Sequence, residues 1–358
     1  MGNPAPAQSA IRNPQSAIPR FVLGAALYVA FAVYLYYPHF GEFSGAQWLF
    51  AANTCAAALG AYLLSRRWVA GFTGSLLAGA IYGFAPFTLG LSRFHPAAGL
   101  LAASVPWLFL PAVFLERKRG KWIGISLLLV PFAVILLFSY LSAGDQWRLF
   151  AAPLGAEVRP SDLAGFIAPL VLAKRGTALM GLYHVPVAAL VLGLVMMWKA
   201  RRYSILILLL IGFLLAFFNS LIGADRVVWL AVSPVLWLSI PLVWCGVLTG
   251  IGLQGLLEAG FADRKWILAS AVILCTLAIV TLFLAARYFQ VLFGLANGYA
   301  LLFVQTAKMY LLGAVAMGIL YLMARQKMRV QWLRWAILCT SLGVDIILGA
   351  RYVIDSIL

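Results

Sequence analysis

Residues 199–222, KARRYSILILLLIGFLLAFFNSLI, decide the fold of this chain. Three basic side chains are followed by a continuous apolar run over residues 203–222. A helix of about twenty residues is about 30 Å long, which matches the hydrocarbon thickness of a bilayer. The run is unbroken rather than alternating, so it predicts a membrane-spanning helix and not a barrel strand.

The same pattern recurs along the whole chain. Of its 358 residues, 64% are hydrophobic and 10% are charged, and the mean hydropathy is +0.99. A soluble chain of this length could not bury so much apolar surface. The apolar runs lie near residues 21–37, 46–65, 68–92, 97–115, 122–141, 180–198, 203–222, 238–257, 266–285, 305–323 and 333–349. They predict an all-α, polytopic membrane protein with about eleven transmembrane helices, because lipid offers the backbone no hydrogen-bond partner.

Two parts are expected along the chain. Residues 1–20 form a polar, Pro-rich tail, and residues 21–358 form a single transmembrane helical domain. The longest non-cytoplasmic stretch in that domain is an outer loop at about residues 142–179.

Charged residues are sorted between the junctions of these runs. One set of junctions carries seventeen basic residues and three acidic ones; the rest of the chain holds nine basic and seven acidic residues. The basic members of the first set are Arg12, Arg20, Arg66, Arg67, Arg117, Lys118, Arg119, Lys121, Lys199, Arg201, Arg202, Arg264, Lys265, Arg325, Lys327, Arg329 and Arg334. The positive-inside rule places this set in the cytoplasm, so the N-terminus is expected inside and the C-terminus outside. The net charge of +16 is then mainly a topology signal, and a nucleic-acid partner is not expected.

Few side chains are available for chemistry. The histidines His39, His95 and His184 are scattered, with no partner at ligand spacing, so the residues themselves predict no metal site. The four cysteines fall inside apolar runs and are expected to pack as small apolar residues.

The first outer loop, PHFGEFSG, holds His39 and Glu42. A carboxylate three residues from a histidine at a membrane surface suits acid–base catalysis, and a solvated turn is the alternative. Arg93 and His95 form a compact cationic cluster that is expected on the same side of the membrane. It suits a lipid phosphate or general contact with lipid headgroups.

The outer loop at 142–179 carries Asp145, Arg148, Arg159 and Asp162. These side chains suit a phosphate or sugar, and a self-neutralising loop network is the alternative. Ser161 and Asp162 follow Pro160 and predict a helix start. The apolar patch 163–173 is too short to span and is expected to lie in the interface or to dip into the membrane.

Four further residues are expected in distinctive environments. Asp345, inside the last run, is a functional candidate by default, with a structural pairing to Arg351 or a hydroxyl as the alternative. Lys308 is expected to extend outward to the interface. Trp229 and Trp237, in the outer segment 225–237, are expected in the interfacial aromatic belt.

The stretch 60–117 resembles the early core of the bacterial YfhO-type proteins of the GT-C superfamily of membrane glycosyltransferases. The shared order is a span ending in basic residues, a small-residue span reaching Tyr-x-Phe-x-Pro, a His-Pro turn and a Pro-rich span ending in Glu-Arg. Here these features are Arg66–Arg67, Tyr82 to Pro86, His95–Pro96 and Glu116–Arg117.

Later segments extend the resemblance to about residues 50–350. RPSDLAGFIAP at 159–169 is similar to the family's outer loop. GLYHVPVAALVLGLVMMWKARR at 181–202 resembles its next span, with Tyr183 matching, and SLGVDIILG resembles its late Asp-bearing helix, with Asp345 matching. The chain departs from the family in its first outer loop, which is only PHFGEFSG.

The resemblance implies a protein of the bacterial inner membrane that handles a polyprenyl-phosphate-linked sugar at the outer face. Glu42 would be the catalytic base, with Asp145 and Asp162 as further catalytic candidates. Arg93, His95, Arg148 and Arg159 would contact the substrate phosphate. A divalent metal ion with the sugar donor is the one cofactor considered.

Two other functions stay open from the sequence. One is a non-catalytic subunit of a membrane complex, suggested by the scarcity of outer carboxylates. The other is a lipid or solute transporter, for which the apolar runs offer few charged residues. Membrane lipids are the expected partners in every case.

Overall fold

The structure is a computed structural model, and it describes residues 14–43, 47–69, 71–91, 96–115, 130–131, 133, 158–171, 181–222, 234–291, 297–326 and 330–358. Every regular element in these ranges is a helix, as the apolar runs predicted. The elements are α1 (Pro14–Tyr36), η1 (Tyr37–His39), α2 (Trp48–Ser65), α3 (Phe72–Gly83), α4 (Pro86–Leu91), α5 (Pro96–Leu115), η4 (Pro160–Phe166), α9 (His184–Lys199), α10 (Tyr203–Ile222), α11 (Pro234–Trp237), α12 (Ser239–Glu258), α13 (Arg264–Val291), α14 (Asn297–Arg325) and α15 (Gln331–Ile357).

Seven helical stretches of the described chain are long and apolar enough to cross a membrane. One of them, Phe72–Leu91, consists of α3 and α4, which are separated where Pro86 follows the C-cap residue Phe84. Shorter apolar helices lie within α5, α9 and α10. The predicted run 122–141 lies outside the described residues except for 130, 131 and 133. The number of eleven spans and the orientation remain predictions.

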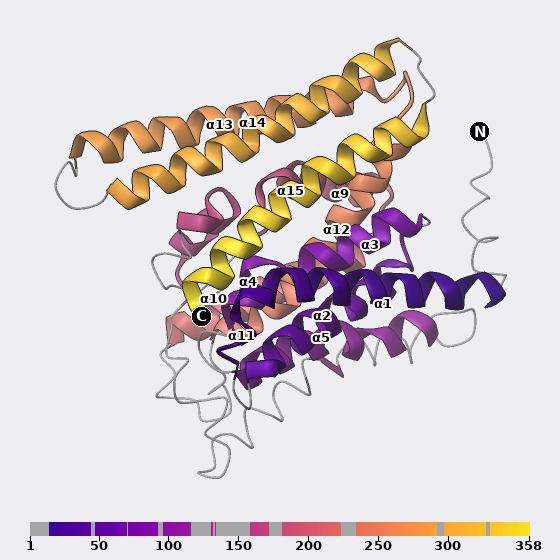
Figure 1. Cartoon of the computed structure of the whole chain (residues 1–358). Helices are drawn as coiled ribbons and strands as arrows, with labels where there is room; N and C mark the ends of the chain where they lie inside the picture. Colours follow the sequence, from indigo (N-terminus) through magenta and orange to yellow (C-terminus); the bar gives the residue numbers. More distant parts are fainter. Residues whose placement is uncertain are drawn as a thin grey trace.

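Helix α12 forms the centre of the bundle and packs against α3, α9 and α10 (Figure 1). The most apolar 18-residue window of the stretch Val235–Glu258 is completely buried, as expected for a helix that is apolar on every face, whereas Glu258 at its end is exposed. Glycines bring it close to α9: a Cβ at Gly252 would lie 1.9 Å from the Ala189 carbonyl oxygen. A Cβ at Gly193 would lie 2.0 Å from the Leu248 carbonyl oxygen. Small residues at such crossings are the usual basis of close helix packing in membranes.

Helices α13 and α14 form a long antiparallel hairpin along one side of the bundle (Figure 1). With 28 and 29 residues they are each about 42 Å long, which exceeds the hydrocarbon thickness. Both helices extend past the predicted apolar runs 266–285 and 305–323, since α13 continues to Val291 and α14 begins at Asn297. A hydropathy pattern identifies only the apolar part of a helix, whereas the helical hydrogen bonds continue into the polar residues at its ends. The observed helices are therefore longer than the predicted runs.

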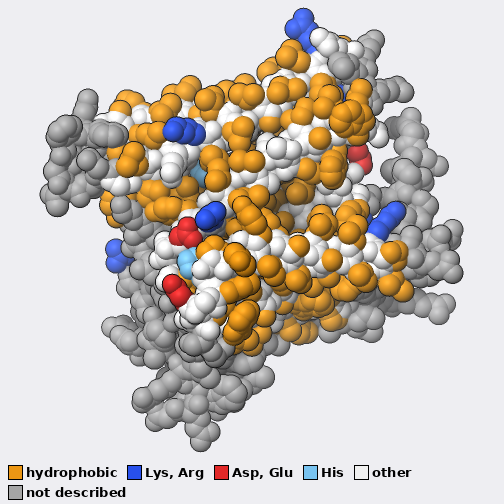
Figure 2. All heavy atoms as spheres, in the orientation of Figure 1, with side chains coloured by type: hydrophobic (Ala, Val, Ile, Leu, Met, Phe, Trp, Pro, Cys, Tyr) orange, Lys and Arg blue, Asp and Glu red, His pale blue; other side chains and the backbone are white. Residues whose placement is uncertain are grey.

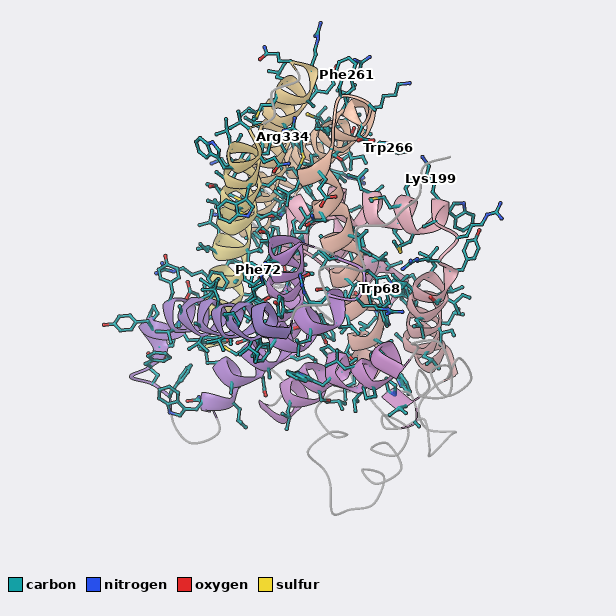
Figure 3. All side chains as sticks on the ribbon, turned by 90° about the vertical axis from the view of Figure 1, so that its right-hand side faces the viewer. Trp68, Phe72, Lys199, Phe261, Trp266 and Arg334 are labelled. Carbon is teal, nitrogen blue, oxygen red and sulfur yellow. The ribbon has the colours of Figure 1, made fainter. Side chains whose placement is uncertain are left out.

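The helix ends that carry the basic residues meet at one end of the bundle, called here the basic end. Lys199, at the end of α9, lies over the ring of Trp266 at the start of α13. Arg334, near the start of α15, donates a hydrogen bond to the Ala259 carbonyl after α12. Figure 3 looks onto this end of the molecule and shows these side chains with Phe261. The charge-sorted junctions on these described elements therefore lie together in space.

Residues of two predicted interfacial segments pack against other helices. Trp237 is 1% exposed and belongs to the main core, so its predicted place in the interfacial belt is wrong. The patch after η4 packs partly against the α13–α14 hairpin through Leu170 and Val171, while Leu163 stays exposed. Trp229 lies outside the described residues.

Candidate functional site

Two histidine–aspartate pairs are built on α15, ten residues apart. The buried pair joins His184 Nδ1 to Asp345 Oδ1 at 2.7 Å, and both side chains are 0% exposed. The exposed pair joins His39 Nε2 to Asp355 Oδ1 at 3.1 Å, with exposed side-chain fractions of 16% and 50%. Ten residues of helix separate the two carboxylates by about 15 Å along the axis.

The buried pair forms because α9 begins inside the bundle. Tyr183 is extended, and the helix, whose first residues are buried in protein, starts at His184. The Val185 amide donates a hydrogen bond to Asp345 Oδ2 at 2.7 Å. Asp345 therefore caps the N-terminus of α9 from another helix.

Aromatic side chains enclose this pair. The Tyr310 ring meets the His184 ring edge-to-face, with centroids 5.0 Å apart, and its hydroxyl donates to the Ile167 carbonyl at 2.7 Å. Tyr183 donates to the Phe84 carbonyl at 2.6 Å. His184 Nε2 is buried and has no hydrogen-bond partner among the described residues. The pair therefore has one unused polar atom in an otherwise closed environment.

The exposed pair extends into a chain of four charged or titratable side chains, called here the outer cluster: Glu42, His39, Asp355 and Arg351. His39 Nδ1 lies 3.9 Å from Glu42 Oε2, and Arg351 Nε lies 3.9 Å from Asp355 Oδ2. The cluster joins the turn after α1 to the last turns of α15, on a face that is otherwise mainly hydrophobic (Figure 2). Glu42, with 74% of its side chain exposed, is its most accessible carboxylate.

The local sequence explains why Glu42 lies there. Pro38 ends α1 in the 3-10 turn Tyr37–His39, and the Glu42 amide then donates to the His39 carbonyl at 2.9 Å. The Phe40 and Phe43 rings pack together with centroids 5.6 Å apart. The chain after α1 is thereby folded into a compact turn, with the Glu42 side chain exposed.

The other predicted site residues are placed as follows. Asp162 is 4% exposed, and its Oδ2 accepts a hydrogen bond from the Arg159 amide at 2.8 Å, so it caps η4. The predicted helix start at this position is confirmed, as a 3-10 helix beginning at Pro160. The remaining predicted site residues lie outside the described residues: Arg93, His95, Asp145 and Arg148.

Sequence reasoning missed the main partner of Asp345. The pairing with Arg351 is wrong, because Arg351 instead faces Asp355 one turn further along α15. His184 and Asp345 are 161 positions apart, so no spacing rule could join them. The Arg351–Asp355 contact, at i and i+4, is one that spacing does reveal.

No group of three histidine, cysteine, aspartate or glutamate side chains in the described ranges is arranged to hold a metal ion. We therefore assign no residue to the divalent ion that was considered with the sugar donor.

A comparison of the chain with known protein families, curated proteins and solved structures finds no match. The resemblance to the YfhO type therefore remains a prediction that rests on the residues quoted above. The class that the structure itself defines is an all-helical protein with apolar helices suited to a membrane.

Proposed function

We propose that the chain is a GT-C-like glycosyltransferase that takes its sugar from a polyprenyl phosphate at the outer face of the bacterial inner membrane. The observation that carries this proposal is the outer cluster, where an exposed carboxylate lies beside an ordered histidine. A donor with an isoprenoid chain would reach the cluster from the lipid that surrounds α1 and α15.

In this proposal Glu42 accepts the proton of the acceptor hydroxyl. The acceptor oxygen forms a bond to the anomeric carbon, and the bond from that carbon to the phosphate oxygen breaks. Polyprenyl phosphate leaves with the electron pair. Carboxylates suit the role of general base, and cationic groups stabilise the charge that develops on a leaving phosphate.

Each neighbour of Glu42 has a defined part in the proposal. His39 lies beside the Glu42 carboxylate and is oriented through its other ring nitrogen by Asp355. Arg351 lies 3.9 Å from Asp355 and is half exposed. It joins Arg93, His95, Arg148 and Arg159 as a proposed phosphate contact, while Asp145 and Asp162 are kept as the alternative carboxylates.

The test is sugar transfer from a polyprenyl-phosphate sugar by the purified full chain. We expect Glu42→Gln to lower the rate by about 100-fold or more, as is usual for loss of a general base. Tyr37→Phe is the matched control, because it changes an exposed side chain in the same turn and keeps its ring contact with Phe40. Equal rates for Glu42→Gln and the wild type would rule out this role for Glu42.

A second candidate, a lipid or solute transporter, is favoured by the buried pair. Ionisable residues within a membrane commonly mark pathways, and His184 and Asp345 supply two of them inside the bundle. The measurement is translocation of a fluorescent phospholipid in vesicles that contain the purified protein. This candidate predicts activity that Asp345→Asn removes. A folded Asp345→Asn variant that translocates lipid at the wild-type rate argues against it.

A further inference from the structure

The basic end contains a cavity that neither the sequence patterns nor the proposed function uses. It has a volume of about 360 Å³ and lies between α9, α12 and the start of α13. Its apolar wall includes Leu192, Val195 and Leu256, and its polar lining includes Lys199, Glu258 and Asp263. Figure 3 shows Lys199 and Trp266, which border it, next to one another at this end. The volume falls in the range of small-ligand pockets.

Glycines on α12 create the space. Gly252 lets α12 touch the α9 backbone, where a Cβ would collide with the Ala189 carbonyl oxygen. One turn further, Gly255 faces Met196, and a Cβ there would approach its sulfur at 3.0 Å. The two helices thus stay close at Gly252, while the missing side chain at Gly255 leaves room between them.

The three charged side chains around the cavity do not neutralise one another. Lys199 Nζ lies 4.1 Å from the centroid of the Trp266 ring. Glu258 accepts a hydrogen bond from Gln254, and Asp263 accepts one from the Gly260 amide. Among the described residues, none of these three charged groups forms a salt bridge, although both signs line one cavity. A ligand with both signs of charge would complete this arrangement.

We propose that the cavity binds the headgroup of a phospholipid that carries a phosphate and a primary ammonium group. The phosphate lies against Lys199, and the ammonium group donates hydrogen bonds to Glu258 and Asp263. The apolar wall receives the start of the acyl chains. Trp266, which borders the cavity, is 39% exposed, and tryptophan is a residue type enriched at the level of lipid headgroups.

The lining also selects between lipid classes. A quaternary ammonium group prefers an open aromatic face, and the face of Trp266 is covered by Lys199. Two carboxylates against one lysine give the lining a net negative charge, which disfavours an anionic headgroup. A primary ammonium group can instead donate up to three hydrogen bonds to the carboxylates.

The first experiment is native mass spectrometry of the detergent-purified full chain with phosphatidylethanolamine, phosphatidylcholine or phosphatidylglycerol of identical acyl chains. We expect phosphatidylethanolamine to bind about tenfold more tightly than the other two, as a charge-assisted hydrogen bond allows. Equal binding of phosphatidylethanolamine and phosphatidylcholine, or a preference for phosphatidylglycerol, overturns the proposal.

Variants locate the site. Glu258→Gln keeps the size of the side chain, and we expect it to weaken phosphatidylethanolamine binding by about tenfold. Lys199→Gln should have a similar effect, whereas Lys265→Gln, an exposed lysine at the same end outside the cavity, should have none. Loss of binding in Lys265→Gln as large as in Lys199→Gln would indicate general surface charge and overturn the site.

A steric variant keeps the test independent of charge. Gly255→Leu fills the cavity and should abolish the preference for phosphatidylethanolamine, while Gly318→Leu adds the same side chain where a Cβ has nothing within 4 Å and should preserve it. Free phosphoethanolamine supplies the same headgroup without acyl chains and should compete only weakly. Full competition by phosphoethanolamine at the lipid's own concentration would identify a soluble ligand and overturn the assignment to a lipid.

Discussion

The two histidine–aspartate pairs on α15 contain the same functional groups in opposite environments. The His184–Asp345 pair is fully buried, with 2.7 Å between His184 Nδ1 and Asp345 Oδ1, and Asp345 also accepts a hydrogen bond from the first turn of α9. The His39–Asp355 pair is partly exposed, with 3.1 Å between His39 Nε2 and Asp355 Oδ1. Its members also lie close to Glu42 and Arg351. Burial makes the first pair a structural requirement, because each member would be left as an uncompensated polar group without the other. Because the second pair is exposed to solvent, it should contribute little to the free energy of folding, and in the proposed function it is accessible to substrate.

The largest expected effect is on the buried pair. Asp345→Ala should lower the free energy of unfolding by about 3–5 kcal/mol, because it leaves His184 and the Val185 amide without their partner. Denaturation by sodium dodecyl sulfate in mixed micelles measures this. Asp355→Ala, on the same helix, is the matched control and should cost less than about 1 kcal/mol. Equal losses in the two variants would end the distinction between the pairs.

The exposed pair should instead affect transfer activity. Asp355→Asn should lower kcat by about tenfold with little change in KM, since Asp355 acts by orienting His39 beside Glu42. Asp355→Glu keeps the carboxylate and should recover part of the rate. An unchanged kcat in Asp355→Asn would show that the pair is only a surface contact.

The aromatic surroundings of the buried pair provide a smaller test. Tyr310→Phe removes the hydrogen bonds to the Ile167 and Phe166 carbonyls and keeps the ring against His184. It should cost about 1 kcal/mol of unfolding free energy, measured in the same mixed-micelle titration. A loss as large as that of Asp345→Ala would mean that the tyrosine, and not the aspartate, determines the stability of this region.

The smallest expected effect is at the end of the outer cluster. Arg351→Gln should change the unfolding free energy by about 0.5 kcal/mol or less, because its contact with Asp355 is exposed and 3.9 Å long. Raising the salt concentration should reduce even this difference through screening. A loss of several kcal/mol that persists in high salt would contradict the assignment of this pair to the solvated surface.

The helical class was predictable because apolar runs and basic junctions are local properties of the chain. Ten of the eleven predicted runs coincide with described helices, and the basic residues Lys199 and Arg334 contact the start of α13 and the end of α12. The residue His39 and its neighbour Glu42 were also recognised as a pair from their spacing. Their connection to Asp355 was not, since it joins residues 316 positions apart.

Asp345 shows why the rest was not predictable. From the sequence its nearest basic neighbour on one helix was Arg351, yet the helix turns that side chain toward Asp355. The true partner depends on where α9 begins, and that point is set by the packing of Tyr183 against Gly349 and Phe84. Such packing follows from the shapes of several helices together.

The sequence alone determined that this chain is made of apolar helices and that most of its basic residues lie at the junctions between them, because hydropathy and charge are properties of each residue and its immediate neighbours. The tertiary structure alone decided which histidine meets which aspartate, and which of the two pairs is buried. It also decided that Lys199, Glu258 and Asp263 share one cavity. The reason is physical: burial and pairing depend on the approach of helices that are distant in sequence, and glycine contacts such as Gly252 with Ala189 set that approach.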